Sequence, residues 1–137
     1  MALPNGAGGY QIGDGNINEA IIKTVPVPAT ATATATLTAA QVLNGILLGS
    51  PGASAASYTL PTVSDLEAAL PAATKAGVSF DFSVINVDGN TSGVITLVAG
   101  TGWTIVGLAT VVATAGTAQL FRARKTGDGA WTLYRIA

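Results

Sequence analysis

The carboxylates are the side chains in this sequence whose types and spacing could do chemistry, because paired carboxylates can serve as general acid and base. Asp65 and Glu67 lie two residues apart in a segment with helical character, so their side chains point in different directions. Asp81 lies between Phe80 and Phe82 in an alternating segment, on the face opposite to the two rings. We therefore expect Asp65 and Glu67 to complement a helix N-terminus. We expect Asp81 to be solvated or paired with an arginine.

The sequence offers few side chains suited to nucleophilic catalysis. The sequence contains no histidine and no cysteine, which excludes imidazole and thiolate chemistry. A hydrolase or transferase would have to use a lysine or a carboxylate as its base. We expect no catalytic residue and no enzymatic activity.

One segment carries oxygen ligands at a spacing that suits calcium. Asp88, Asn90 and Ser92 present them at alternate positions, but no bidentate acidic residue follows. Residues 88–93 are therefore predicted to form a hairpin turn, and we expect no metal and no cofactor. The glycines of residues 6–15 neither follow a strand nor open a helix, so they are not a phosphate-binding loop.

Most of the basic residues lie near the end of the chain: Arg122, Arg124, Lys125 and Arg135. On a strand, Arg122 and Arg124 share one face and Lys125 takes the other. The three arginines could contact an acidic protein surface, or they could form a solvated hairpin face paired with Asp81 and Asp128. The net charge of −1 and the lack of a broad basic stripe with interleaved aromatic residues argue against nucleic acid.

The composition is unusual for a domain of 137 residues. Charged residues make up 9% of the chain, against about 25% in an average soluble domain, and the mean hydropathy is +0.51. Residues 24–64 and 89–121 contain no charge at all. No stretch supplies the roughly 18 consecutive apolar residues of a membrane-spanning helix, and no secretory signal is visible at the N-terminus. We therefore expect no membrane partner and interpret the low charge as burial in an assembly.

Two regions differ in character. Residues 1–28 are rich in glycine and end in two prolines, so they cannot bury enough surface to fold alone. We interpret them as an extended N-terminal arm and connector, with Leu3, Tyr10, Ile12 and Ile17 spaced as contact residues. Residues 29–137 are assigned to one β-sandwich domain.

The most regular stretch of the chain is Ala29 to Leu37, which reads ATATATATL. Its period of two indicates a strand with threonines on one face and alanines on the other. A single rank of threonines is too narrow for an ice-binding plane, and no parallel copy occurs elsewhere in the sequence. We expect an ordinary strand of small residues where sheets or subunits come close, and no ligand site.

The remaining elements are short. Thr38 is expected to cap a helix over residues 39–44 that Gly45 ends, and Ser64 is expected to cap a second over residues 64–71. Strands are expected over residues 46–48, 55–61, 78–87, 94–98, 103–108, 110–113, 118–125 and 130–136. Asp128-Gly129 predicts a hairpin between the last two strands. Short strands with such turns predict an all-β, antiparallel sandwich or barrel of the jelly-roll type.

Three segments resemble a group of structural proteins of tailed bacteriophages, the head decoration or cement proteins. They are LTAAQVLNGILLGSPGASAASYTLPT, VSFDFSVINVDGNTSGVITLVAGTGWTIVG and FRARKTGDGAWTLYRIA. Together they cover most of residues 37–137. The shared features are an LTAAQ helix, a YTLPT strand, an FDFSVIN strand, an AGTGWT turn and a closing RARKTG and WTLYR hairpin.

The resemblance implies a function in the virion. It implies a β-rich homotrimer that binds the major capsid protein on the outer capsid surface, where an N-terminal arm reaches across capsid subunits. Leu3, Tyr10, Ile12 and Ile17 would then be capsid contacts. The alternative is a tail-fibre tip or receptor-binding module of the same kind of phage.

Overall fold

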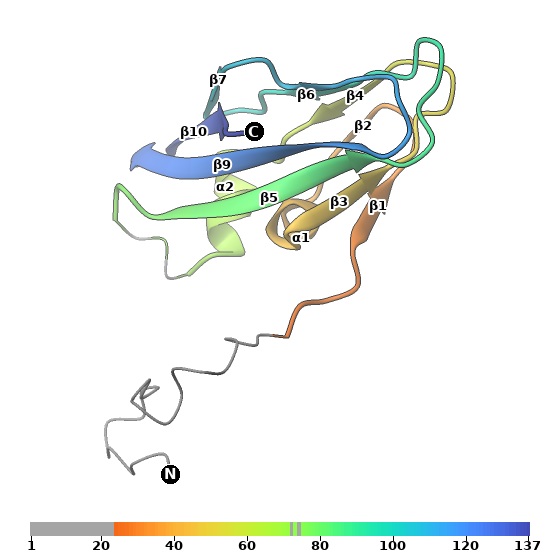
Figure 1. Cartoon of the computed structure of the whole chain (residues 1–137). Helices are drawn as coiled ribbons and strands as arrows, with labels where there is room; N and C mark the ends of the chain where they lie inside the picture. The colour runs from red at the N-terminus through yellow and green to blue at the C-terminus, as the bar shows by residue number, and fades with distance from the viewer. Residues whose placement is uncertain (1–23, 72, 74) are drawn as a thin grey trace, which may run out of the picture.

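A computed structural model of the chain describes residues 24–71, 73 and 75–137. These residues form two stacked sheets with two short helices (Figure 1). The larger sheet has six strands in the order β1-β3-β5-β9-β10-β7, and the smaller has four in the order β2-β4-β6-β8. The strands are β1 (Ala29–Ala31), β2 (Ala35–Thr36), β3 (Ile46–Gly49), β4 (Ala56–Thr59), β5 (Ser79–Asn86), β6 (Ile95–Val98), β7 (Trp103–Val106), β8 (Thr110–Val111), β9 (Thr117–Gly127) and β10 (Ala130–Arg135).

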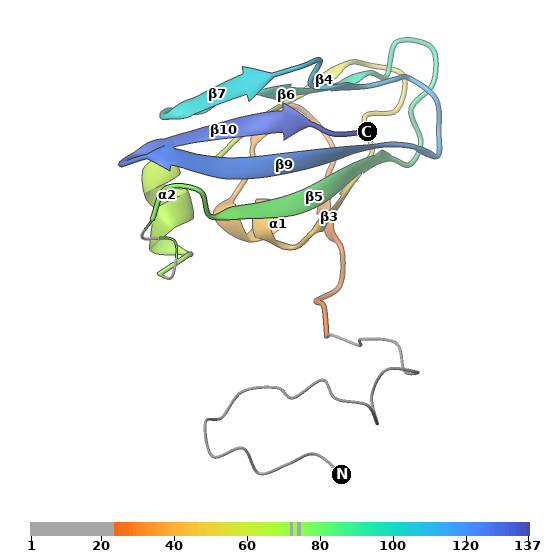
Figure 2. The same cartoon turned by 60° about the vertical axis from the view of Figure 1, so that its left-hand side comes forward.

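Successive strands alternate between the sheets from β1 to β9, with odd-numbered strands in the larger sheet and even-numbered strands in the smaller one. From β1 to β6, each return to a sheet runs in the same direction as the previous strand in that sheet. Strands β1, β3 and β5 are parallel, as are β2, β4 and β6. Leu47 is in register with Ala29 on one side and Val84 on the other. The first half of the domain is thus a flattened coil (Figure 2).

The expected antiparallel, all-β jelly roll is therefore wrong. Five of the eight strand pairings are parallel, and only β5–β9, β9–β10 and β6–β8 are antiparallel. The chain is a mixed α/β structure with helices of five and six residues. The error has a physical cause, since alternation along a strand fixes which side chains face inward and is the same for both strand directions.

The ATATATATL segment is not the single strand that its period predicts. It forms β1 in the larger sheet and β2 in the smaller, with a bend at residues 33–34. The buried Tyr58 hydroxyl donates to the carbonyl oxygens of Ala31 (3.0 Å) and Thr32 (3.1 Å), where the chain leaves the larger sheet. Burial raises the pKa of Tyr58, and the nearby Asp88 charge raises it further, so the hydroxyl stays protonated as a donor. The segment crosses between sheets because a buried tyrosine needs acceptors there.

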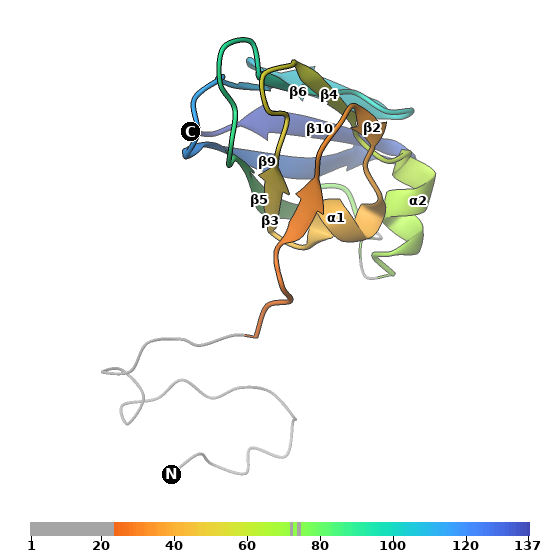
Figure 3. The ribbon, with the colours of Figure 1, turned by 90° about the vertical axis from the view of Figure 1, so that its right-hand side faces the viewer.

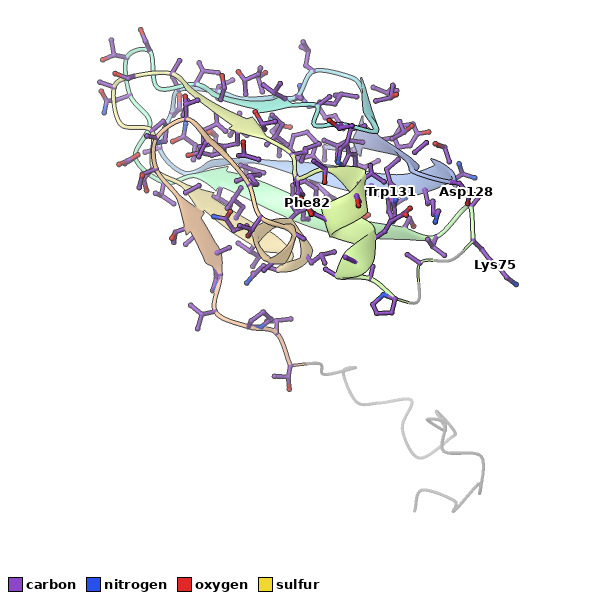
Figure 4. All side chains as sticks on the ribbon, turned by 180° about the vertical axis from the view of Figure 1, so that it is seen from behind. Lys75, Phe82, Asp128 and Trp131 are labelled. Atoms are coloured by element: carbon purple, nitrogen blue, oxygen red, sulfur yellow. The ribbon has the colours of Figure 1, made fainter. Side chains whose placement is uncertain are left out.

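Both helices follow local sequence signals. Helix α1 (Ala39–Leu43) has the expected cap: the backbone N–H of Gln41 donates to Thr38 Oγ1, and Gln41 Oε1 accepts from the backbone N–H of Thr38. It ends before Gly45, whose φ of +97° favours glycine. Helix α2 (Val63–Ala68) begins earlier than expected, because Thr62 and not Ser64 is its cap. The helices lie together on the inner side of the larger sheet (Figures 3 and 4).

The core is built from the inward-facing residues of both sheets. Phe82 and Val84 face inward as the alternation of their segment predicts, at 1% and 0% exposure. Trp103 and Trp131 are also core residues, with ring centroids 6.0 Å apart although they are distant in sequence. Figure 4 shows Phe82 and Trp131 in the interior, and Lys75 and Asp128 at the edge of the molecule.

A buried asparagine joins two loops at one end of the sandwich, the β5–β6 loop and the β8–β9 loop. The Asn86 side chain donates to the carbonyl oxygens of Gly93 (2.8 Å) and Val112 (3.0 Å), and it accepts from the N–H of Gly89 (2.6 Å). Asn86 is 0% exposed, so these bonds satisfy an amide that would otherwise be costly to bury.

Candidate functional site

Arg122 forms an ion pair with Asp81 on the outer face of the larger sheet. Its Nε and Nη2 donate to the two carboxylate oxygens of Asp81 at 2.8 and 3.0 Å, across registered positions of β5 and β9. The hydrogen bonds from Arg122 hold the pKa of Asp81 below its usual value, and the same pairing raises the pKa of Arg122. The expectation that Asp81 pairs with an arginine is confirmed.

The three arginines do not lie together on one surface. Arg124 shares the outer face with Arg122, in register with Ser79 and Thr132. Arg135 follows Leu133 by two residues on β10, so it projects from the opposite side at the end of the sheet. A combined patch of Arg122, Arg124 and Arg135 is therefore not assembled in this subunit.

Lys125 takes the inner face, as the alternation predicts, and it forms the most enclosed ionic contact of the described residues. It is 5% exposed. Its Nζ lies 2.9 Å from Glu67 Oε1 and donates to the carbonyl oxygen of Ala73 at 2.9 Å. Trp131 Nε1 donates to the same Glu67 oxygen at 3.0 Å. This cluster of Glu67, Lys125 and Trp131 ties α2 to the β9–β10 hairpin.

The assignment of Glu67 to the helix N-terminus is wrong. Only Asp65 lies in the first turn of α2, and Glu67 lies near its end. Hydrogen bonds from Lys125, and then from Trp131, lower the pKa of Glu67. The carboxylate is therefore ionised at neutral pH, and its Oε1 binds two core side chains, Lys125 and Trp131, which gives it a structural role.

An apolar pocket lies beside this cluster. Its volume is about 220 Å³, and it is lined by Leu70, Ala73, Val78, Ser79, Phe80 and Trp131. The polar side-chain groups of its lining residues are the Ser79 hydroxyl and the Trp131 indole N–H, which is already bonded to Glu67. The pocket is smaller than the roughly 300–1,000 Å³ of typical small-molecule sites, and it could accept one apolar side chain.

A second depression, of about 330 Å³, carries more polar groups. Its lining is Thr62, Val63, Ser64, Glu67, Thr101, Gly102 and Gly129. Two of its polar groups are already engaged: Thr62 Oγ1 accepts from Asp65, and Glu67 is held by Lys125. The arrangement can bind a hydroxyl-bearing group at most weakly.

The Asp88–Asn90–Ser92 segment forms a turn, but the predicted hairpin is wrong, because β5 and β6 on either side of it lie in different sheets. Asp88 Oδ1 accepts from the backbone N–H of Gly52 at 3.1 Å, and Asn90 Nδ2 donates to the carbonyl oxygen of Asp88 at 3.2 Å. The turn therefore docks onto the neighbouring residues 51–53. Within residues 24–71, 73 and 75–137, no three acidic, histidine or cysteine side chains converge as metal ligands.

The proposed arm contacts Leu3, Tyr10, Ile12 and Ile17 lie outside the described residues. The structure does show how the chain enters the domain. Asn44 Nδ2 donates to the carbonyl oxygen of Val27 at 2.7 Å, and Gln41 Nε2 donates to that of Thr30 at 2.8 Å. Side chains of the α1 region thus fix the segment before β1, while Val27 is 86% exposed.

The outer face of the larger sheet is divided into an apolar and a polar end. The apolar end contains Ile46, Leu48, Ile85, Leu120 and Ile136, which we call the outer apolar band. The polar Ser83 also faces outward there, in register between Ile46 and Leu120. Register places Leu48 beside Ile85, and the N–H of Ile136 donates to the carbonyl oxygen of Leu120. The polar end contains Ser79, Asp81, Arg122, Arg124, Thr132 and Thr104. Figure 1 looks onto this face, with both helices behind it.

Sequence reasoning missed the two features that bind distant parts of the chain. Lys125 was placed on the correct face, but nothing local indicates that Glu67 is its partner. Asn86 continues the series of inward positions on β5 that includes Phe82 and Val84. A polar residue at such a position indicates a buried side chain that must form hydrogen bonds. The outer apolar band was also detectable, because residues 46–48 read ILL without alternation.

Comparisons with known proteins leave the family open. No family model, characterised protein or solved structure matches this chain significantly. Among the helices of the described residues, none has the length and apolar character needed to cross a membrane.

Proposed function

We propose that this chain is a structural virion protein that decorates and stabilises the outer capsid of a tailed bacteriophage. In this proposal it acts as a homotrimer bound to the major capsid protein, and residues 1–28 form an arm that clamps neighbouring capsid subunits. The observation that carries the proposal is the chain's very low charge combined with apolar groups at its surface. Burial in a large assembly removes such groups from water at about 25 cal/mol per Å².

The surface of the described residues supports an assembly function. Large apolar side chains remain exposed on several sides, including Val27 at 86%, Leu108 at 69% and Val112 at 52%. The ionised side chains with shifted pKa are Glu67, Asp81 and Arg122, and each is held in an intramolecular pair. Each of these groups is thus engaged within the described part of the chain, and these groups do not converge on one pocket as catalytic groups usually do.

The segments that carry the resemblance to cement proteins lie in elements and turns of the described domain. LTAAQ forms the cap and first turns of α1, YTLPT includes the end of β4 and the cap of α2, and FDFSVIN forms most of β5. The AGTGWT segment leads into β7, and the last segment forms the β9–β10 hairpin. Each shared segment is thus a structural element or turn of one scaffold, which fits a structural function.

The arm is tested by deleting residues 2–17. The truncated protein is expected to fold and to self-associate as the full chain does, because every described core residue lies beyond residue 28. It is expected to bind phage heads that lack the decoration protein far more weakly than the full chain, measured by co-sedimentation. Full decoration by the truncated protein would refute the arm assignment.

Copy number separates the proposal from its alternative. A decoration protein is present in hundreds of copies in each particle, whereas a tail-fibre tip or receptor-binding module is present in few. The intensity of the band on a gel of purified virions, relative to the major capsid protein, discriminates between the two.

A further inference from the structure

We propose that the outer apolar band is the surface through which copies of this chain associate. The inference rests on the proposed function in one respect, since it names the self-association surface of the same assembly. It is carried by the packing of the larger sheet and by the distribution of charge over its outer face.

Strand β3, beneath the band, has the character of a strand covered on both sides. Parallel sheets usually have both faces buried, and their strands are then continuously apolar. Strand β3 reads ILLG: Leu47 faces the core at 0% exposure, while Ile46 on the other face is 37% exposed. Its parallel neighbour β5 alternates, with Ile85 outward near its end and the polar Ser83 outward beside Ile46. The apolar outer surface is therefore concentrated on β3 and the end of β5.

The rest of the described chain leaves this face open. Helices α1 and α2 lie on the inner side, where Val42 and Leu66 are 0% exposed. Figure 3 shows the larger sheet edge-on, with both helices on one side of it. The outer face must find its cover outside residues 24–71, 73 and 75–137.

Charge favours a second copy as the cover. The band carries no ionisable side chain, and the nearest ion pair, Asp81–Arg122, neutralises itself through two hydrogen bonds. Because the band attracts neither positively nor negatively charged groups, the partner surface that complements it best is also uncharged. This chain is such a partner, with 9% charged residues and a net charge of −1.

The available area is also suitable. The six strands of the larger sheet range from the three residues of β1 to the eleven of β9, and with about 4.8 Å between strands and about 3.3 Å per residue they give a flat face of about 600 Å². Stable interfaces bury about 800 Å² on each partner. The apolar band would be the core of such an interface, and the polar end with Asp81, Arg122 and Arg124 would be part of its rim.

The test is the self-association of the full chain with a single lysine on β5. In Ile85→Lys the new charge lies in the centre of the band, and an unpaired ammonium group is costly to bury. Ser79→Lys is the matched control, because it adds the same charge to the same strand and face at the polar end. Sedimentation equilibrium is expected to show roughly a tenfold or greater rise in the dissociation constant for Ile85→Lys, and no change for Ser79→Lys.

A second variant and a folding measurement keep the test decisive. Leu48→Lys, in register with Ile85 on β3, is expected to behave as Ile85→Lys does. Tryptophan fluorescence and the unfolding midpoint identify any variant that fails to fold. If either Ile85→Lys or Leu48→Lys fails to fold, the dissociation constant of the other variant tests the inference.

The possible results separate this inference from the proposed function. If Ile85→Lys and Leu48→Lys both self-associate with the dissociation constant of the wild type, the inference is overturned and the capsid proposal stands. A monomeric wild type would also overturn it, and would leave the band to residues 1–23 or to another protein. Heads that fail to bind the wild-type oligomer would instead refute the capsid proposal alone.

Discussion

Replacing Asn86 with alanine removes the side chain that joins two loops at one end of the sandwich. The change leaves the N–H of Gly89 and the carbonyl oxygen of Gly93, both in buried residues, without their partner. The carbonyl oxygen of Val112 keeps its hydrogen bonds from the N–H of Thr114 and from Thr117 Oγ1. Two buried groups left unpaired cost about 1–3 kcal/mol each. With the small cavity, we expect a loss of about 3–5 kcal/mol of unfolding free energy.

The assay is thermal unfolding followed by circular dichroism, with wild type and variant at equal protein concentration because association shifts the midpoint. For a domain of this size, 1 kcal/mol corresponds to about 3–4 °C, so the midpoint is expected to fall by about 10–20 °C. Asn90→Ala is the matched control: Asn90 lies in the same loop but is exposed, and its amide donates only to the carbonyl oxygen of Asp88. We expect a shift of no more than about 3 °C for it.

The reasoning would be refuted by equal midpoints for the two variants. That result would mean that the two loops hold their positions without the central amide. The carbonyl and N–H groups of Gly93 and Gly89 would then have to be satisfied by water.

Three further predictions concern packing and charge. Gly49→Ala would place a Cβ against Ile95 and Tyr58 and is expected to cost about 1–3 kcal/mol, measured by urea unfolding; Gly127→Ala, which meets no atom within 4 Å, is its control. Glu67→Gln removes a carboxylate whose pKa is lowered in the folded state, so its contribution to stability is present above the unfolded pKa and is lost as pH falls through the folded pKa. The gap in unfolding free energy between wild type and Glu67→Gln should therefore close on acidification, and a gap that is constant with pH would contradict the prediction. Asp81→Asn breaks an exposed pair and is expected to leave the unfolding midpoint nearly unchanged; a large drop would show that this pair stabilises the sheet.

Local signals in the sequence predicted the elements well. Thr38 with Gln41, followed by Gly45, specifies the cap and the end of α1 because those groups satisfy backbone donors within a few residues. Alternation over β5 identified Phe82 as a core residue and Asp81 as an outward one. The hairpin at Asp128-Gly129 also forms as predicted, with Gly129 at a φ of +66°.

The arrangement of these elements could not be predicted in the same way. Strand direction depends on where the chain goes between strands, and the crossing at residues 33–34 is set by the Tyr58 hydroxyl, which belongs to another strand. The contact of Lys125 with Glu67 likewise joins α2 to β9 and leaves no local pattern. Sequence periodicity reports which side chains are buried, whereas topology depends on contacts between residues far apart in the chain.

The most direct test of the assembly account is the number of copies of this chain in purified virions, measured by quantitative mass spectrometry against the major capsid protein. The account predicts hundreds of copies in each particle, in a fixed ratio to the major capsid protein. Absence from the particle, or only a few copies, would contradict it.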